Sequence, residues 1–299
     1  MNDSFTPRQV ARALGVSESS LKRWCDRDIL KTVRTAGGHR RVAFDEVARF
    51  CRESGRTLAE PELLGLPAAV GSGTTVFGRA ALQFKTALIA GDEEVARRVV
   101  LDLFLTKHSI RQIGDEVIAP ALREIGSEWQ CGEVAVWQER RGCEIVQRVI
   151  FELSRLAPNP TPTAPLALGA TLEGDPYRLS TMLCEATLRE AGWRAESLGS
   201  SLPIPSLIEA LGKLKPKLCW VSVSHIADLD SYIAGLNDLY RATHDAGIAL
   251  AIGGRAIDDA LCERIRYSVR CGSLAELHAY AEPLRDLGGA TLAKKKRSP

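Results

Sequence analysis

The stretch Gly174-Asp175-Pro176-Tyr177-Arg178-Leu179-Ser180 decides how the second half of the chain is interpreted. A short apolar run over residues 166–172 precedes it, and a helical pattern over residues 179–191 follows it. The stretch is therefore predicted to be a loop that leads from a strand into a helix. In an open parallel sheet such loops lie at the carboxyl ends of the strands, where ligands bind. Polar loops of this kind are also common as plain connections, so the loop alone leaves both interpretations open.

Strand and helix patterns alternate through the rest of the chain, after a proline-rich spacer at residues 157–165. Five pairs of a short apolar run and an amphipathic stretch predict a doubly wound parallel sheet of the Rossmann-like kind over residues 166–288. The predicted elements, strand and helix in turn, are residues 166–172, 179–191, 194–198, 204–214, 218–224, 229–246, 248–252, 256–264, 267–270 and 274–287.

Two motifs of small residues stand at the ends of later predicted strands, Ser222-Val223-Ser224 and Gly253-Gly254. Together with Asp175 they resemble the cobalamin-binding domain of methionine synthase and methylmalonyl-CoA mutase, whose pattern is Asp-x-His-x-x-Gly, then Ser-x-Leu, then Gly-Gly. The resemblance implies a site for a corrin ring at this edge of the sheet. Its candidate residues are Asp175, Tyr177, Ser222, Ser224, Gly253 and Gly254.

The metal-binding part of that pattern is missing. Tyr177 stands where the family has its cobalt-ligating histidine, Ser180 where it has glycine and Ser224 where it has leucine. A phenol is a poor ligand for cobalt at neutral pH, because the reference pKa of tyrosine is about 10. The resemblance supports the fold without the usual metal bond, and no metal-ligating residue is predicted. Cobalamin, another tetrapyrrole and no ligand at all remain as alternatives.

The first residues of the chain carry the start signals of two short helices. Thr6 can cap the first helix, Pro7 suits its first position, and Gly15 ends it. Ser17 can cap the second helix. Two short helices joined by a turn that contains glycine form a helix-turn-helix, whose second helix enters the major groove of DNA.

A basic hairpin is predicted directly after these helices. Gly37-Gly38 permits a tight turn, from which Arg34 and His39-Arg40-Arg41 project as a small β wing. Asp45 is expected to cap a third helix. Positive charge clustered around one turn is what binding to phosphate needs.

Residues 6–53 resemble the MerR-type and excisionase-like winged helix-turn-helix family, and Gly37 to Arg41 match its wing signature. The resemblance implies a DNA-binding domain at residues 1–56, with a recognition helix over residues 17–23. Trp24 is expected to belong to its core. The candidate DNA-contacting residues are Ser17, Ser19, Ser20, Lys22, Arg23, Arg34, Gly37, Gly38, His39, Arg40 and Arg41.

The middle of the chain is predicted to be helical. Residues 57–77 are rich in glycine and proline and are predicted to be a linker. Four amphipathic stretches with short connections then indicate a four-helix bundle over residues 78–156. Trp137 is placed on the core face of the fourth stretch.

Trp129 in the third stretch is followed, after nine residues, by Glu139-Arg140. This spacing resembles the cap domain of the light- and cobalamin-responsive MerR-type repressors of carotenoid genes, whose motif is Trp-x9-Glu-His. Arg140 replaces the histidine. The resemblance implies that Trp129, Glu139 and Arg140 face the upper side of a corrin ring. For Trp129 the alternative is a plain core aromatic.

Length and composition agree with this organisation. A chain of 299 residues with 45% hydrophobic residues can bury the cores of two or three domains. No run is long enough to span a membrane, and the N-terminus lacks a signal sequence, so a cytoplasmic location is expected. The eight cysteines form no C-x-x-C pair and are expected to be reduced.

The charge is unevenly distributed along the chain. The formal net charge is only +2, yet residues 1–56 contain twelve Lys and Arg against seven Asp and Glu. Lys294 to Arg297 add a basic tail within residues 289–299, and the region between is acidic. A basic head on an acidic body is expected to meet a polyanion.

These features predict a DNA-binding transcription regulator, controlled by a cobalamin-binding-type sensor that lacks the usual axial histidine. The expected partners are double-stranded operator DNA and further copies of the chain, as a dimer or tetramer, because two tethered modules gain affinity by effective concentration. No catalytic residue is predicted. Two alternatives stay open: a ligand-free sensor that acts as a protein-interaction module, and a corrinoid carrier related to methyltransferases.

Overall fold

Two compact units, Met1–Ala157 and Pro158–Pro299, make up the chain. The computed structural model describes residues 4–35, 37–56, 58–65 and 74–295. Residues 66–73 of the predicted linker, and Lys296 and Arg297 of the predicted tail, lie outside the described residues. Within the described part, no helix combines the length and the apolar character needed to span a lipid bilayer.

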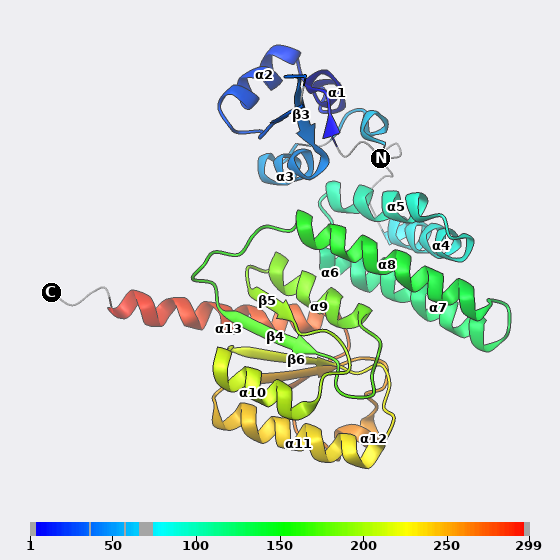
Figure 1. The fold of residues 1–299 in the computed structure, drawn as a ribbon, viewed down its shortest axis with the longest axis vertical. Coiled ribbons are helices and arrows are strands. Elements are labelled where there is room, and N and C mark those ends of the chain that lie inside the picture. The colour runs from blue at the N-terminus through cyan, green and yellow to red at the C-terminus, as the bar shows by residue number, and fades with distance from the viewer. Residues whose placement is uncertain (1–3, 36, 57, 66–73, 296–299) are drawn as a thin grey trace. The chain divides into compact units, whose positions relative to one another are not determined.

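The first unit begins with the predicted pair of short helices (Figure 1). Helix α1 (Pro7–Ala13) is capped by Thr6, whose side chain accepts a hydrogen bond from the amide of Gln9. Helix α2 (Glu18–Asp26) is capped in the same way by Ser17, which accepts from the amide of Ser20. Gly15 joins the helices at a φ of 63°, a conformation that glycine adopts without strain.

Three short strands form an antiparallel sheet beside these helices, in the order β1 (Ser4–Phe5), β3 (Arg40–Ala43) and β2 (Val33–Arg34). β2 and β3 are the predicted hairpin, which turns at Gly38 with a φ of 77°. β1 was not predicted, because two residues are too few to show an alternating pattern.

The segments on either side of helix α3 (Phe44–Ser54) differ from the prediction. Asp45 does not cap α3: the helix begins at Phe44, directly after β3, and no side chain caps it. Asp45 lies in the first turn, where its carboxylate interacts favourably with the positive end of the helix dipole. Residues 58–65 of the predicted linker pack on the domain, because the turn η1 (Pro61–Leu64) contacts α1 and the amide of Ala59 donates to the carbonyl of Ala13 at 2.7 Å.

The remainder of the first unit is helical. Helices α4 (Thr74–Ala90), α5 (Glu93–Leu105), α7 (Ala119–Gln130) and α8 (Val136–Leu156) pack against one another. The third predicted stretch is a helix α6 (Ile110–Ile113) that runs through the π-helical turn η2 (Gly114–Ile118) into α7. Buried apolar side chains fill the space between the helices, among them Phe84, Leu88, Phe104, Ile113, Ile118 and Ile145.

The N-terminal domain contacts these helices through α3. The guanidinium carbon of Arg52 lies 3.9 Å from the centre of the Phe104 ring. The same guanidinium donates to the carbonyl of Phe104, near the end of α5, at 3.2 Å. Arg52 therefore joins the two parts of the first unit by a stacking contact and a hydrogen bond.

The second unit is a five-stranded parallel sheet, as predicted, and the structure shows that its strands lie in the order β5-β4-β6-β7-β8. Its strands are β4 (Leu166–Ala170), β5 (Arg194–Ser197), β6 (Leu218–Ser222), β7 (Ala249–Gly253) and β8 (Val269–Cys271). The chain leaves β4 and β6 toward opposite faces of the sheet. The loops after these two strands therefore flank the switch point, the place where ligands bind in open α/β sheets.

Helices cover both faces of this sheet (Figure 1). One layer holds α10 (Ile204–Leu214), α11 (Leu229–Asp245) and α12 (Asp259–Cys262), which pack on Leu168, Val221 and Ile252. The other holds α9 (Leu179–Glu190) and α13 (Leu274–Lys295). Helix α13 runs past its predicted end at residue 287, since the two glycines there weaken a helix without forbidding it.

A tryptophan fills the space between the sheet and α9. The indole of Trp220 lies against Gly169 on the neighbouring strand, where a β-carbon would overlap the ring. Its Nε1 donates to the hydroxyl of Thr181 on α9 at 3.0 Å, and all three residues are buried. This layer of the unit is therefore closed by the side chains of the protein itself.

Candidate functional site

Helix α2 presents a polar face to solvent. Leu21 and Cys25 are buried on its inner face, which leaves Ser19, Lys22 and Arg23 exposed. Trp24, which was expected in the core, is only half-buried, and its ring lies 4.9 Å from that of Phe50 on α3.

The hydroxyl of Ser17 does not reach outward from the start of α2. It lies 2.9 Å from the hydroxyls of both Ser19 and Ser20, besides capping the helix. Of the predicted recognition residues, Lys22 and Arg23 are therefore the long exposed side chains, while Ser17 and Ser20 also serve the local structure.

The hairpin divides its basic residues between two faces. Arg34 pairs with Arg40 across the ladder, and Val33 pairs with Arg41. Side chains alternate along a strand, so Arg40 shares the face of the buried Val42, and Arg41 lies on the opposite face. At the turn, the amide of Thr35 donates to the carbonyl of His39 at 2.9 Å, and this hydrogen bond closes the hairpin.

Arg40 has a partner within the protein. Its Nη1 donates to Oδ1 of Asp26, the last residue of α2, at 2.5 Å. This hydrogen bond lowers the pKa of Asp26 and raises that of Arg40. In the part of the chain that the structure describes, the side chains of Arg34, Arg41 and Lys22 form no hydrogen bond or ion pair. The predicted phosphate-contacting set thus contains one residue that is already engaged.

A hollow of about 400 Å³ lies between α1, α2 and β3. It brings together three of the predicted residues, Ser19, Lys22 and Arg40. It also includes Arg8 of α1, which the sequence did not single out because an isolated arginine in the first helix has no pattern around it. Arg8 forms an exposed ion pair with Glu18 at 3.3 Å.

Two tryptophans are exposed where α7 ends and α8 begins. Trp129 is 46% exposed and Trp137 is 61% exposed, beside Val136. The alternative of a core aromatic is therefore wrong for Trp129, and so is the core position predicted for Trp137. Trp137 is the second residue of α8 and precedes the buried residues of that helix, and the guanidinium of Arg141 stacks on its ring at 4.9 Å. Large apolar side chains that stay exposed, such as Trp129, Val136 and Trp137, are candidates for a binding surface.

Glu139 and Arg140 follow in the first turns of α8. Nε of Arg140 lies 3.5 Å from Oε2 of Glu139, and the thiol of Cys143 donates to Oε1 of Glu139 at 3.3 Å. Burial, with a further contribution from Glu139, raises the pKa of Cys143 to about 12. The Glu139 carboxylate is therefore held between a cation and a neutral thiol.

Asp175 joins three loops at the carboxyl edge of the sheet. Only 1% of it is exposed. Its Oδ1 accepts from the amide of Tyr177 at 3.1 Å, and its Oδ2 accepts from the amides of Ser224 and His225 at 2.6 and 3.2 Å. Its carbonyl accepts from the amide of Ser201 at 3.1 Å. The residue predicted to orient a ligand is thus surrounded by backbone groups of the protein.

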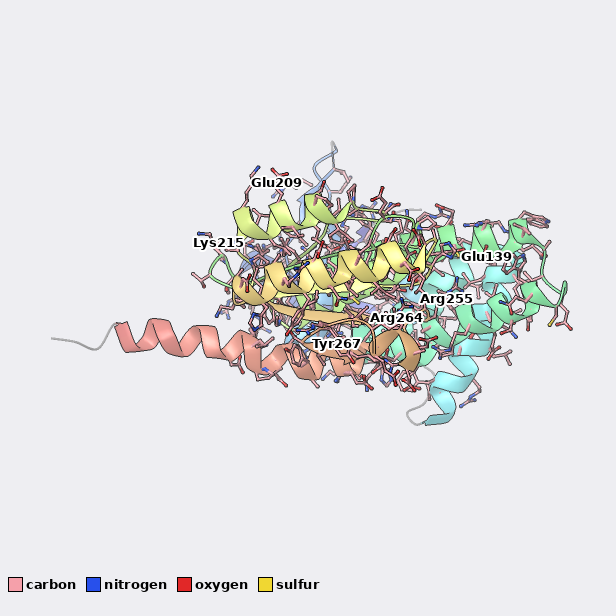
Figure 2. The ribbon with its side chains drawn as sticks, turned by 90° about the horizontal axis from the view of Figure 1, so that it is seen from below. Glu139, Glu209, Lys215, Arg255, Arg264 and Tyr267 are labelled. Carbon is pink, nitrogen blue, oxygen red and sulfur yellow. The ribbon has the colours of Figure 1, made fainter. Side chains whose placement is uncertain are left out.

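The other predicted loop residues are also engaged within the protein. Arg255, labelled in Figure 2, stacks on the ring of Tyr177 at 5.1 Å and donates from Nε to the carbonyl of Ser224 at 3.0 Å. Ser222 is buried, with its hydroxyl 3.8 Å from Sγ of Cys184. The β-carbon positions of Gly253 and Gly254 are filled by the carbonyls of Cys271 and Val223.

These residues do not fit a bond between the protein and cobalt. Tyr177 supplies no imidazole, and the carboxylate beside it already accepts three backbone hydrogen bonds. The space that side chains would occupy at Gly253 and Gly254 is filled by backbone carbonyls of the protein. In a ligand-binding loop, the ligand would occupy that space. Within the described residues, no group of three or more His, Cys, Asp or Glu side chains is arranged to hold a metal ion.

Comparison with known families bears on both parts of the first unit. Residues 4–54 match the model of a helix-turn-helix domain, and residues 81–153 match the model described as a B12 binding domain. The chain therefore contains a region similar to a helix-turn-helix domain, followed by a region similar to a B12 binding domain. The second match covers α4 to α8, the region of the exposed tryptophans, and not the parallel sheet.

Individual proteins extend the likeness to most of the chain. The HTH-type transcriptional repressor CarH of Myxococcus xanthus is 25% identical over 286 residues, which cover 87% of this chain and 92% of that protein. The structure of the monomethylamine corrinoid protein of Methanosarcina barkeri superposes with a TM-score of 0.58 at 15% identity, over 69% of this chain and 99% of that one. At this identity the second likeness shows a shared fold alone.

A cobalamin-binding protein from Desulfitobacterium hafniense is more distant, with a TM-score of 0.37 at 16% identity over 70% of this chain and 98% of that one.

Proposed function

We propose that this protein is a transcription regulator that binds double-stranded DNA through α2 and the β2–β3 hairpin, as a winged helix-turn-helix. The observation that carries the proposal is the pairing of an exposed basic α2 face with a hairpin whose Arg34 and Arg41 have no partner within the described residues. Such a surface suits a major groove flanked by phosphates. The match to a helix-turn-helix domain and the similarity to a repressor support it.

The finer parts of the proposal concern control and assembly. The helices α4 to α8 would act as the cap of a sensor, with Trp129 and Glu139 on its ligand-facing side. A dimer or tetramer acting in the cytoplasm would place two DNA-binding domains on a palindromic or tandem operator, because one small module has limited affinity. The exposed apolar surface of Trp129, Val136 and Trp137 supports a role in binding.

Duplex DNA binding by the full-length protein tests the function directly. We expect a labelled duplex of mixed sequence to bind with an affinity that falls steeply between about 50 and 200 mM salt, because phosphate contacts release counterions. Fluorescence anisotropy measures the affinity and its slope. Binding that is absent at low salt, or that does not change with salt, would remove the proposal.

The sensor has a second candidate role, as a ligand-free module that binds a protein. The contacts that Asp175, Gly254 and Trp220 make within the protein favour this ligand-free role. Side chains and backbone of the chain itself fill the loop edge of the sheet and the layer under α9. For the ligand-bound alternative, the match to a B12 binding domain supports a corrinoid that keeps its own lower ligand. A different tetrapyrrole belongs to the same alternative.

Adding a histidine at the loop edge tests whether the Asp175 loop can support a bond between the protein and cobalt. We expect Tyr177→His to leave the absorption spectrum of added adenosylcobalamin, and its affinity, unchanged. The enclosed Asp175 carboxylate is bonded to backbone amides and is poorly placed to orient an imidazole, which a metal-bound histidine needs. Ultraviolet and visible spectra of both proteins, titrated in the dark, give the measurement.

His225→Ala is the control for the histidine that already lies in a loop at this edge. A spectrum of histidine-coordinated cobalt in the Tyr177→His variant would show that the Asp175 loop can rearrange, and the ligand-free role would then be unsupported.

A further inference from the structure

The ion pair between Asp26 and Arg40 stands out among the charges of the DNA-binding domain. Asp26 is the last residue of α2, where the negative end of the helix dipole disfavours a carboxylate. A residue that breaks a local preference usually has a compensating contact. Here the compensating contact is the hydrogen bond from Arg40 on β3, at 2.5 Å.

The same contact relieves a second unfavourable arrangement. Arg34 and Arg40 lie directly opposite each other in the hairpin, and like charges at such positions destabilise a ladder. Asp26 supplies the opposite charge from outside the sheet. It thereby ties the hairpin to the end of the helix whose exposed face carries Lys22 and Arg23.

We propose that Asp26 is a positioning residue for DNA binding, which acts through Arg40 to hold the hairpin at a set place relative to α2. The inference rests on the proposed function. It assigns to Arg40 a role different from that of Arg41, which lies on the other face of the strand. Arg41 then contacts phosphate, and Arg40 places it there.

The direction in which one substitution changes DNA affinity decides between this positioning role and direct contact of Arg40 with phosphate. If Asp26 holds the hairpin in place, Asp26→Asn weakens DNA binding by the full-length protein about two- to five-fold, the range of an exposed ion pair. If Arg40 is itself a phosphate ligand held back by Asp26, the same change frees Arg40 and tightens binding. Fluorescence anisotropy on a labelled duplex of mixed sequence measures both outcomes.

Asp28→Asn is the matched control, because Asp28 is an exposed carboxylate two residues further on and its positive φ of 54° suits asparagine. It removes the same charge and leaves the ion pair intact, so we expect no loss of affinity. The double variant Asp26→Arg with Arg40→Asp restores the pair in the opposite sense. We expect its affinity to return to within about two-fold of the parent.

The slope of affinity against salt provides an independent readout. Arg41→Ala is expected to lower the slope by about 0.9, the value of one lost phosphate contact, whereas Asp26→Asn should leave it unchanged. A parent protein without salt-dependent binding would contradict the proposed function. The positioning role alone would be overturned if three results came together. These are salt-dependent binding by the parent, a smaller slope in Arg41→Ala, and full affinity in Asp26→Asn.

Discussion

Asp175→Ala is expected to lower the free energy of unfolding of the second unit by about 3 kcal/mol, because it removes a buried acceptor that three partly buried backbone amides share. These amides, of Tyr177, Ser224 and His225, belong to the loops after β4 and β6. The loss separates two loops that the carboxylate now joins, so both should open more readily. Hydrogen exchange of peptides that cover β4 and β6, in the full-length protein, measures the change for this unit.

Two further variants give the prediction its control. Asp245→Ala removes an exposed carboxylate of the same unit and should change stability by no more than about 0.5 kcal/mol. Asp175→Asn keeps one side-chain oxygen as an acceptor and should fall between the two. If exchange in Asp175→Ala matches that in Asp245→Ala, Asp175 does not hold the loops together.

Removing the charges of Arg34 and Arg41 together is expected to weaken DNA binding by about 10- to 100-fold, since each lost charged hydrogen bond contributes about 1 kcal/mol or more. The slope of affinity against salt should fall by about 1.8, corresponding to two fewer phosphate contacts. Both side chains are without a partner in the described residues, so the change removes no visible internal contact. Anisotropy of the double alanine variant across a salt series measures both quantities.

Lys213→Ala with Arg241→Ala is the matched control for this prediction. These residues lie on α10 and α11 of the second unit, and within the described residues each pairs with a carboxylate one turn away on its own helix. The control removes the same charge, and we expect its affinity and slope to equal those of the parent. An equal loss in both double variants would mean that net charge, and not the hairpin, governs binding.

Sequence patterns within a few residues were sufficient to predict most of the strands and helices. The predicted boundaries in the second unit agree with the structure to within a few residues for nearly every strand and helix, as for α10 at residues 204–214. Buried parallel strands and amphipathic helices differ in period and length, so each can be recognised from its own residues. The two N-terminal helices were recognised in the same way from Thr6 and Ser17, whose capping bonds span three residues.

The candidate site depended on contacts that no local signal reports. The sequence identified Asp175, Arg40 and Trp129 as functional candidates by spacing and resemblance. It did not show that Asp175 accepts amides 49 and 50 residues away, that Arg40 bonds to Asp26, or that Trp137 is exposed.

The sequence by itself thus determined the two N-terminal helices and the parallel sheet, because periodicity and capping act over a few residues. Only the tertiary structure decided which charged side chains are engaged and which remain available to a ligand. A carboxylate at the end of a strand has the same local sequence whether it faces a cofactor or three backbone amides. The difference lies in how distant loops pack around it, which is a property of the folded chain.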